Sequence, residues 1–350
     1  MAGLDLCAPL AGLYRAGWAA KRAWTRRRPP IRLGVPVVSL GNLTTGGTGK
    51  TEATAAVAAM LRGEGWRPAV LSRGYGRRGA GAMRVVSRGN GPELPVRQAG
   101  DEPYLLARRL AGTAVVVGAD RIQTGRLAAA ELGCDVMILD DGFQRRDQLA
   151  RDADIVLIDA KDSLAGARLL PCGRLREPPE MLAEADAFLL TRADQADPTP
   201  ARDLLARLAP GKPCWRVRHV PMQWRPLASG TGEPVEALRG RRLLAVCGIA
   251  RPEAFRATLT GLGCRIEAFE AYPDHHWFTR SEQSRLAARA RGLGAEIMMT
   301  AKDAVRWRGP APDGVRVGFL EVALQWLDDP PGWRRWLRGR LDHRRTRHAS

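Results

Sequence analysis

The residues best suited to chemistry lie in the segment VPVVSLGNLTTGGTGKT, residues 35–51. A β-branched apolar run leads into a loop rich in glycine and threonine, which ends in Gly-Lys-Thr. In phosphate-binding loops, glycines let consecutive backbone N–H groups converge on an anion, and the following helix adds the positive end of its dipole. Lys50 would supply a charge to the β- and γ-phosphates, and Thr51 a hydroxyl to Mg²⁺. The pattern predicts an ATP-binding loop formed by Thr44, Thr45, Gly46, Gly47, Thr48, Gly49, Lys50 and Thr51.

The loop departs from the usual phosphate-loop spacing at one position. A glycine is usual five residues before Gly49, where this chain has Thr44, so the pair Gly46-Gly47 must supply the backbone freedom. A solvated glycine-rich turn before an ordinary helix is the alternative interpretation. The apolar strand pattern before the loop and the apolar helical pattern of residues 53–61 favour nucleotide binding.

A second candidate group follows an apolar run, where Asp140 and Asp141 stand side by side. In phosphate-loop enzymes a strand of this kind ends in an aspartate that organises Mg²⁺, and oxygen atoms are the ligands that this cation prefers. An Asp-Gly turn would explain the pair without any chemistry. Together with the Gly-Lys-Thr loop upstream, the pair predicts Mg²⁺ as a cofactor, with Asp140 holding the cation through water.

Two further segments carry acids and histidines. GDEP places Asp101 and Glu102 at a predicted helix start, where helix capping explains them without catalysis. YPDHHWFT places His275 and His276 beside Asp274 in a segment too polar for a core strand, and the chain has only five histidines. A histidine pair next to an acid is a candidate for base chemistry or metal binding. Metal binding lacks further ligands at suitable spacing.

The elements that must position these residues follow an alternating pattern. Short apolar strands are predicted at residues 69–71, 114–117, 136–139, 155–158 and 187–190, each followed by polar or glycine-rich residues. This pattern predicts an α/β fold whose mostly parallel sheet is flanked by helices and gathers functional groups at the strands' carboxyl ends. We expect five parts: an N-terminal basic amphipathic helix (1–30), a main domain with the phosphate loop (31–210), a connection (211–242), a smaller α/β domain (243–335) and a solvated basic tail (336–350).

The first 30 residues predict an amphipathic helix. Leu10, Leu13, Tyr14, Gly17 and Trp18 fall at helical spacing on one face, with basic residues on another. Charged residues and a proline interrupt every window of the roughly 18–20 apolar residues that a membrane span requires, and no secretory signal is recognised. The pattern fits a helix in an anionic lipid interface and, equally, a helix docked on the core of the same chain.

The composition indicates a folded protein with an anionic partner. The 350 residues are 45% hydrophobic, which is enough for a normal core. Lysine and arginine outnumber the acids 55 to 37, a net charge of +18 that favours nucleic acid, a membrane surface or a phosphorylated substrate. The six cysteines show neither CxxC nor histidine-paired spacing, so we expect reduced cysteines and no structural metal.

A series of motifs runs along the chain in the order VVSLGNLTTGGTGKT, SRGYGR, GDEP, GADR, DDGFQ, LPCGRLREP, YPDHHWFT and TAKDAV. This series closely resembles the tetraacyldisaccharide 4'-kinases of lipid A biosynthesis, which have a P-loop NTPase-like fold. The resemblance implies a kinase that uses ATP to phosphorylate the 4'-hydroxyl of a tetraacylated glucosamine disaccharide 1-phosphate, forming lipid IVA. It also implies a peripheral protein on the cytoplasmic face of the bacterial inner membrane, and it makes the membrane role of the N-terminal helix the favoured one.

The resemblance implies a role for each matching residue. Asp101 would pair with a histidine, most simply His275, to form the base that acts on the sugar hydroxyl, and Lys50 would neutralise the migrating phosphoryl group. This assignment replaces helix capping as the interpretation of Asp101. The implied metal site comprises Thr51, Glu102, Asp140, Asp141 and Glu177, and the implied substrate contacts are Arg73, Tyr75, Arg121, Gln144 and Arg176.

The chain departs from the family pattern at Arg145, where a histidine is usual, at Glu52, where a proline is common, and at Ala301 in the TAKD segment. We therefore transfer no role to Arg145. A partitioning-type ATPase switch is an alternative function, but its signature lysine would fall at Thr45. A nucleic-acid-binding protein would use the positive charge for backbone contacts, yet no recognised motif is present, and no nucleic acid is expected.

Overall fold

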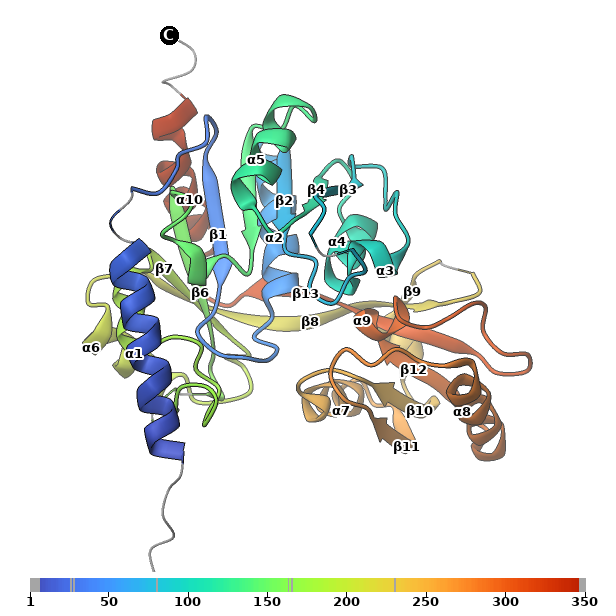
Figure 1. Ribbon diagram of the computed structural model, residues 1–350. Helices are drawn as coiled ribbons and strands as arrows, with labels where there is room; N and C mark the ends of the chain where they lie inside the picture. The colour runs from blue at the N-terminus through green and yellow to red at the C-terminus, as the bar shows by residue number, and fades with distance from the viewer. Residues whose placement is uncertain are drawn as a thin grey trace, which may run out of the picture.

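The computed structural model describes residues 7–25, 27, 29–79, 81–162, 164, 166–229 and 231–345. It confirms the α/β class: one mixed sheet of 13 strands, most of them parallel, is flanked by helices (Figure 1). The strand order is β11-β10-β12-β13-β8-β7-β6-β1-β5-β2-β4-β3, and β9 pairs with β8 beside this path. The sheet therefore runs without a break from the N-terminal to the C-terminal part of the molecule.

The strands are β1 (Val37–Gly41), β2 (Pro68–Ser72), β3 (Arg84–Ser87), β4 (Ala114–Val117), β5 (Val136–Asp140), β6 (Ala153–Asp159), β7 (Ala187–Thr191), β8 (Cys214–Pro226), β9 (Glu233–Pro234), β10 (Arg242–Cys247), β11 (Arg265–Ala271), β12 (Glu296–Thr300) and β13 (Val317–Trp326). The α-helices are α1 (Cys7–Thr25), α2 (Lys50–Gly63), α3 (Val96–Ala99), α4 (Asp101–Arg109), α5 (Arg121–Ala130), α6 (Thr199–Leu208), α7 (Pro252–Gly261), α8 (Arg280–Leu293), α9 (Ala301–Ala304) and α10 (Pro330–Arg345). Three short 3₁₀ helices are η1 (Phe143–Arg145), η2 (Pro179–Glu184) and η3 (Val235–Leu238).

The strand that leads into the phosphate loop, β1, lies between β5, which ends in the acid pair, and β6. β1 pairs in parallel with β5 and with β6, and in the first pairing Leu40 stands opposite Asp140. Every residue of β1, β5 and β6 is buried, as expected for strands covered on both faces. Because parallel strands end at the same edge, this register brings the phosphate loop and the acid pair side by side.

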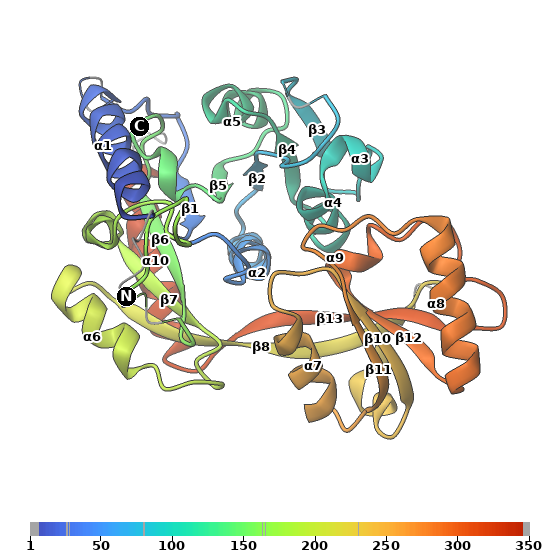
Figure 2. The same ribbon diagram turned by 60° about the horizontal axis from the view of Figure 1, so that its bottom comes forward.

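Helices cover both faces of the sheet. In the N-terminal part, α2, α4 and α10 contribute to one buried cluster, whereas α5 packs in another cluster with β2, β4 and β5. In the C-terminal part, α8 and α9 pack with β10 and β12, and α7 packs in a separate cluster with the same strands. Figure 2 shows both groups of helices, with β8 and β13 running between them.

The connection expected at residues 211–242 contains the longest strand. β8 pairs in parallel with β7 at its start and then antiparallel with β13 from Val217 to Pro226. Trp215 and Val217 are buried between less buried arginines, which is the alternation of a strand with one covered face. The prolines disguised this pattern in the sequence. Pro221 is tolerated because it lies at a register shift against β13.

The basic tail expected at residues 336–350 is also structured as far as residue 345. Trp333, Leu337 and Leu341 follow one another on one face of α10 and are buried in the same cluster as Val57 and Leu61 of α2. The many arginines occupy the other positions of this helix, so composition alone suggested a solvated end. Residues 346–350 lie outside the described part of the chain.

We predict that Leu337→Ala destabilises the protein by about 2–5 kcal/mol, because it opens a cavity in a closely packed cluster. Arg334 lies exposed on the same helix, so Arg334→Ala is the matched control and should change the unfolding free energy by less than about 0.5 kcal/mol. Urea denaturation followed by circular dichroism measures both values. Equal stability of the two variants would show that α10 is not part of the core.

Candidate active site

The phosphate loop connects β1 to α2, and its backbone explains the unusual sequence. In the loop, Gly46 and Gly49 have positive φ angles of 107° and 86°, whereas Thr44 does not need one. Thr44 is buried and bridges to Leu175 through its backbone, and the N–H of Thr45 donates to the carbonyl of Arg174 at 2.8 Å. The segment of Arg174 and Leu175 thus supports the loop at this point, and a glycine at position 44 is not needed.

Two residues to which the sequence analysis assigned no role hold the loop from the side of β7 and β8. Arg192 donates to the carbonyl of Gly47 at 2.5 Å and pairs with the buried Asp159 at 3.3 Å. A Cβ atom at Gly49 would lie 2.7 Å from Nε2 of His219. Position 49 therefore requires glycine both for its φ angle and for this close contact.

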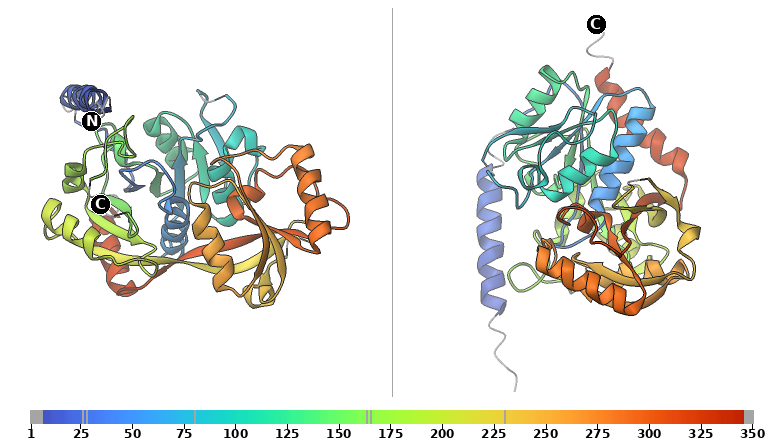
Figure 3. Two further views of the ribbon diagram at one scale, coloured as in Figure 1. Left: turned by 90° about the horizontal axis from the view of Figure 1, so that it is seen from below. Right: turned by 90° about the vertical axis from the view of Figure 1, so that its right-hand side faces the viewer.

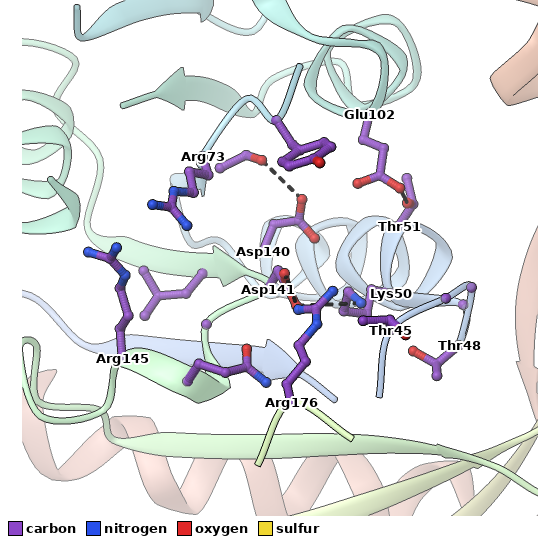
Figure 4. Close-up of a pocket in the computed structure, with 18 of the residues that line it drawn as sticks. Thr45, Thr48, Lys50, Thr51, Arg73, Glu102, Asp140, Asp141, Arg145 and Arg176 are labelled. Carbon is purple, nitrogen blue, oxygen red and sulfur yellow. Dashed lines mark hydrogen bonds and ion pairs between the residues drawn. The ribbon is translucent and has the colours of Figure 1, made fainter. Parts of the chain in front are cut away.

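The acid pair meets the lysine of the loop. The ammonium of Lys50 lies 3.4 Å from Oδ1 of Asp141 and donates to Oδ1 of Asn42 at 2.9 Å. The other oxygen of Asp141 accepts from Arg176 at 2.8 Å, and Asp141 has a φ angle of 57°, which turns the chain sharply after β5. Figure 4 shows Lys50, Asp141 and Arg176 converging on one point of the site.

Asp140 is buried and hydrogen-bonded to hydroxyls. Its oxygens accept from Ser72 at 3.1 Å and from Thr54 at 3.4 Å. Burial, followed by the charges of Glu102 and Asp141, raises the pKa of Asp140 to about 6. Burial alone would also raise the pKa of Asp141, but Lys50 and Arg176 outweigh it and hold that pKa below its ordinary value.

Glu102 connects the phosphate loop to the C-terminal part of the chain. Its Oε1 atom accepts from the hydroxyl of Thr51 at 3.3 Å and from the ammonium of Lys302 at 2.6 Å. The charge of Lys302 is the main cause of a lowered pKa for Glu102. No role was assigned to Lys302 from the sequence, although its TAKD segment follows the largely buried strand β12, as the acid pair follows the apolar run of β5.

The oxygen atoms of Thr51, Glu102 and Asp140 suit a small divalent cation. The described residues contain no group of three His, Cys, Asp or Glu side chains arranged to hold a metal ion by themselves. Mg²⁺ is commonly bound by one or two carboxylates together with phosphate oxygens and water, so it needs no such cage. The crowded, partly uncompensated carboxylates around Asp140 fit a cation that arrives with a nucleotide.

The structure separates the two adjacent histidines. Nδ1 of His275 lies 2.7 Å from Oδ2 of Asp101, whereas Nε2 of His276 lies 3.1 Å from Oε1 of Glu282. His276 also stacks on the ring of Tyr272 at 4.5 Å. His275 is therefore the histidine that the structure pairs with Asp101, and His276 contributes to local packing.

The contact between Asp101 and His275 shifts the pKa values of both residues in opposite directions. The hydrogen bond that His275 donates to Asp101 is the largest influence on the imidazole and raises its pKa above the ordinary value, although burial opposes it. Burial would raise the pKa of Asp101, but the contact with His275 and the charge of Arg306 outweigh it and lower that pKa. Asp101 thus stays ionised beside an imidazole that binds a proton more strongly than usual.

The expected substrate residues border the same cavity of about 1290 Å³. Tyr75 is 80% exposed, with its ring 6.1 Å from that of His275, and Gln144 donates to the carbonyl of Asn42 at 2.5 Å. Arg121 donates to the carbonyl of Gly118, and burial lowers its pKa to about 10. All of the predicted site residues except Thr44 line the cavity, and Arg73 is one of the lining residues.

Glu177 and Arg145 lie apart from the carboxylates of Asp140, Asp141 and Glu102. Both oxygens of Glu177 are engaged elsewhere, one by Arg146 at 3.0 Å and the other by the indole of Trp18 at 3.5 Å. Its expected role as a metal ligand stays a prediction. Arg145 bonds to Gln148 at 3.2 Å and lies away from Lys50 in Figure 4.

The N-terminal helix has two different faces. Tyr14 donates to the carbonyl of Arg176 at 3.0 Å, and Trp18 reaches Glu177, so this face docks beside the site. Leu10, Leu13 and Trp24 are 50%, 71% and 66% exposed on another face. Figure 3 shows α1 along the outside of the molecule. Among the described residues, no helix is long and apolar enough to cross a bilayer, and residues 1–6, 26 and 28 lie outside them.

Comparison with known proteins gives consistent matches. A family model described as tetraacyldisaccharide-1-P 4'-kinase matches residues 4–342. The tetraacyldisaccharide 4'-kinases of Anaeromyxobacter dehalogenans (strain 2CP-C) and Anaeromyxobacter sp. (strain K) are each 48% identical over 320 residues, which cover 89% of this chain and 84% of theirs. The crystal structure of the "apo" form of LpxK from Aquifex aeolicus in complex with ATP superposes with a TM-score of 0.73 at 30% identity, covering 95% of this chain and 98% of that one. The order of the motifs, the parallel sheet and these matches over most of the chain agree, and the chain belongs to the tetraacyldisaccharide-1-P 4'-kinase family.

Proposed function

We propose that this protein transfers the γ-phosphate of ATP to the 4'-hydroxyl of a tetraacylated glucosamine disaccharide 1-phosphate. The contact between Asp101 and His275 on the wall of the phosphate-loop cavity carries the proposal. Glu102, the next residue after Asp101, contacts Thr51 of the loop, so the partner of the base and a contact to the phosphate site share the first turn of α4. The family membership supplies the identity of the acceptor.

The chemistry follows from charge and position. The transition state of phosphoryl transfer is loose, and its charge lies mainly on the equatorial oxygens, so cations at fixed positions contribute most. Lys50 and Arg176 both contact Asp141, and a bound phosphate can take over their interactions. Mg²⁺, held by Thr51 and Asp140 with Glu102 nearby, would supply further neutralisation when bound.

His275 would act as the general base. A sugar hydroxyl is a poor nucleophile near neutral pH, so removal of its proton as the new bond forms lowers the barrier. With Nδ1 bonded to Asp101, the imidazole is left to accept that proton at Nε2, and Asp101 stabilises the resulting cation. The strained φ angle of 63° at His275 indicates a backbone held for function rather than for local stability.

We also propose that α1 holds the protein at the cytoplasmic surface of the inner membrane. The acyl chains of the acceptor leave a bilayer only at high cost, and the exposed face of Leu10, Leu13 and Trp24 can enter the lipid interface. Lys21 and Arg15 are exposed on the same helix and can contact anionic head groups. The cytoplasmic side is the side on which ATP is available.

Two adjacent histidines provide a matched test of the reaction. Transfer of labelled γ-phosphate to the acyl disaccharide 1-phosphate should occur with the wild-type protein, and His275→Ala should lower kcat by about 10²–10⁴-fold because the base is lost. Calorimetry should show unchanged binding of Mg-ATP. His276→Ala is the control and should keep kcat within about fivefold, since His276 contacts Glu282 and Tyr272 instead of Asp101.

If wild-type protein binds Mg-ATP but phosphorylates no acyl disaccharide, the proposed function is wrong. If His275→Ala keeps near-normal kcat, the base assignment is wrong.

The pH profile of kcat should report the state of His275. The base works only when neutral, so kcat falls as the pH drops through the pKa of this imidazole. The hydrogen bond to Asp101 raises that pKa, with further contributions from the charges of Asp274 and Glu102, and the acidic limb should therefore lie above the ordinary histidine value of about 6.5. Asp101→Asn should move the limb to lower pH, measured under saturating Mg-ATP. An acidic limb below pH 6 in the wild-type protein would contradict the assignment.

Membrane attachment can be tested by substitutions on two faces of one helix. Replacing Leu10, Leu13 and Trp24 by Ser should move the protein from the vesicle-bound to the free fraction in flotation with anionic vesicles. Ala16, Ala19 and Ala23 are exposed on a different face, so their replacement by Ser is the control and should leave the distribution unchanged. Equal flotation of the two triple variants would rule out the proposed lipid face.

A further inference from the structure

Arg306 is a cation buried between the N-terminal and C-terminal parts of the chain. Its side chain is 1% exposed, and it lies two residues after the end of α9. Its guanidinium donates to the carbonyl of Lys302 at 3.0 Å and to the carbonyl of Gly248 at 3.1 Å, and it pairs with Asp303 at 3.2 Å. A buried charge is costly unless it is paired and hydrogen-bonded, and Arg306 meets both conditions.

The partners of Arg306 are the groups that hold the backbone of His275. The carbonyl of Gly248 accepts from Arg306 and also from the backbone N–H of His275 at 3.2 Å. The N–H of Gly248 donates to Asp303 at 2.9 Å. Gly248 is therefore fixed from both sides by the Arg306–Asp303 pair. Because His275 has a positive φ angle, its backbone needs such external support.

Arg306 also faces the other member of the catalytic pair. Its Nε atom lies 3.6 Å from Oδ2 of Asp101, the same oxygen that Nδ1 of His275 contacts. The hydrogen of Nε is directed to the carbonyl of Lys302, so the interaction with Asp101 is an attraction between charges. Asp101 comes from α4 and His275 from the loop after β11, and one guanidinium contacts Asp101 itself and the carbonyl of Gly248 that supports His275.

We propose that Arg306, held by Asp303, is a positioning residue that aligns Asp101 and His275 for proton removal. This inference rests on the proposed function, because it assumes that His275 is the base. A displacement of about 1 Å in a reacting group can cost about 10²-fold in rate. Loss of Arg306 should therefore act on turnover, while the phosphate loop and its nucleotide remain as they are.

The first experiment compares kcat and KM in three variants. Arg306→Met, which keeps the length of the side chain but removes the charge, should lower kcat about 10–100-fold and leave KM for Mg-ATP within about twofold. Arg306→Lys should recover part of the loss, because it keeps the charge but cannot reach all three partners. Arg241→Met is the control: Arg241 pairs with Glu296 at 3.3 Å in the same part of the chain, without contact to the catalytic pair, and kcat should be unchanged.

The decisive measurement is a double-mutant cycle. If Arg306 acts through the catalytic pair, Arg306→Met added to His275→Ala should lower residual turnover by no more than about twofold. An equal loss in both backgrounds would overturn the positioning role and leave the proposed function intact. Wild-type turnover of His275→Ala alone would instead contradict the base assignment and, with it, the alignment that rests on it, whereas the proposed function fails only if the wild-type protein phosphorylates no acyl disaccharide.

A second variant covers the case in which Arg306→Met does not fold. A Cβ atom at Gly248 would lie 3.0 Å from the carbonyl oxygen of Pro273 and 3.1 Å from Cβ of His276, so Gly248→Ala shifts the loop that carries His275. We expect the same loss of kcat, and the same absence of further loss in the His275→Ala background. Normal kcat in a folded Gly248→Ala protein would contradict the proposal.

Discussion

The contact between Asp101 and His275 is the interaction that the rest of the architecture must maintain. The aspartate begins α4 in the N-terminal part, and the histidine lies in the loop after β11 in the C-terminal part, so the pair exists only if the two parts keep a fixed relation. The long antiparallel pairing of β8 with β13 extends the sheet through both parts. Lys302 and Glu102 add a second contact beside the pair.

The site balances charges that come from separate elements. Asp140, Asp141 and Glu102 bring three carboxylates close together, and burial, followed by the charges of Glu102 and Asp141, raises the pKa of Asp140. Lys50, Arg176 and Lys302 approach from the phosphate loop, the segment before η2 and α9. Cations that are already in place need little reorganisation when charge develops on a ligand, which is the condition for electrostatic catalysis.

Features that depend on residues close together in the sequence could be predicted from it. The parallel strands follow from short apolar runs and are confirmed. The phosphate loop and the acid pair at the end of β5 lie side by side, as their order after these strands predicts, and their roles stay predictions. β8 and α10 were missed as elements because prolines and arginines masked their apolar periodicity. The roles of Arg192 and Arg306 had no local signal, since the contacts that indicate them are made to residues far away in the sequence, such as Gly47 and Asp101. Lys302 lies in a motif that follows a strand, but its partner Glu102 is also distant in the sequence. The choice between His275 and His276 likewise depends on a loop conformation.

The two faces of α1 have a consequence for how deep an acceptor can sit. Tyr14 and Trp18 fix the helix to the segment that also presents Arg176 to the acid pair, whereas Leu13 and Trp24 point away from the protein. With α1 lying in lipid as proposed, the height of the catalytic cleft above the leaflet becomes a fixed property of the fold. The enzyme would then select an acceptor by the distance of its sugar from the hydrocarbon boundary. The length of the acyl chains inside the bilayer would have little effect on whether the sugar reaches the catalytic cleft.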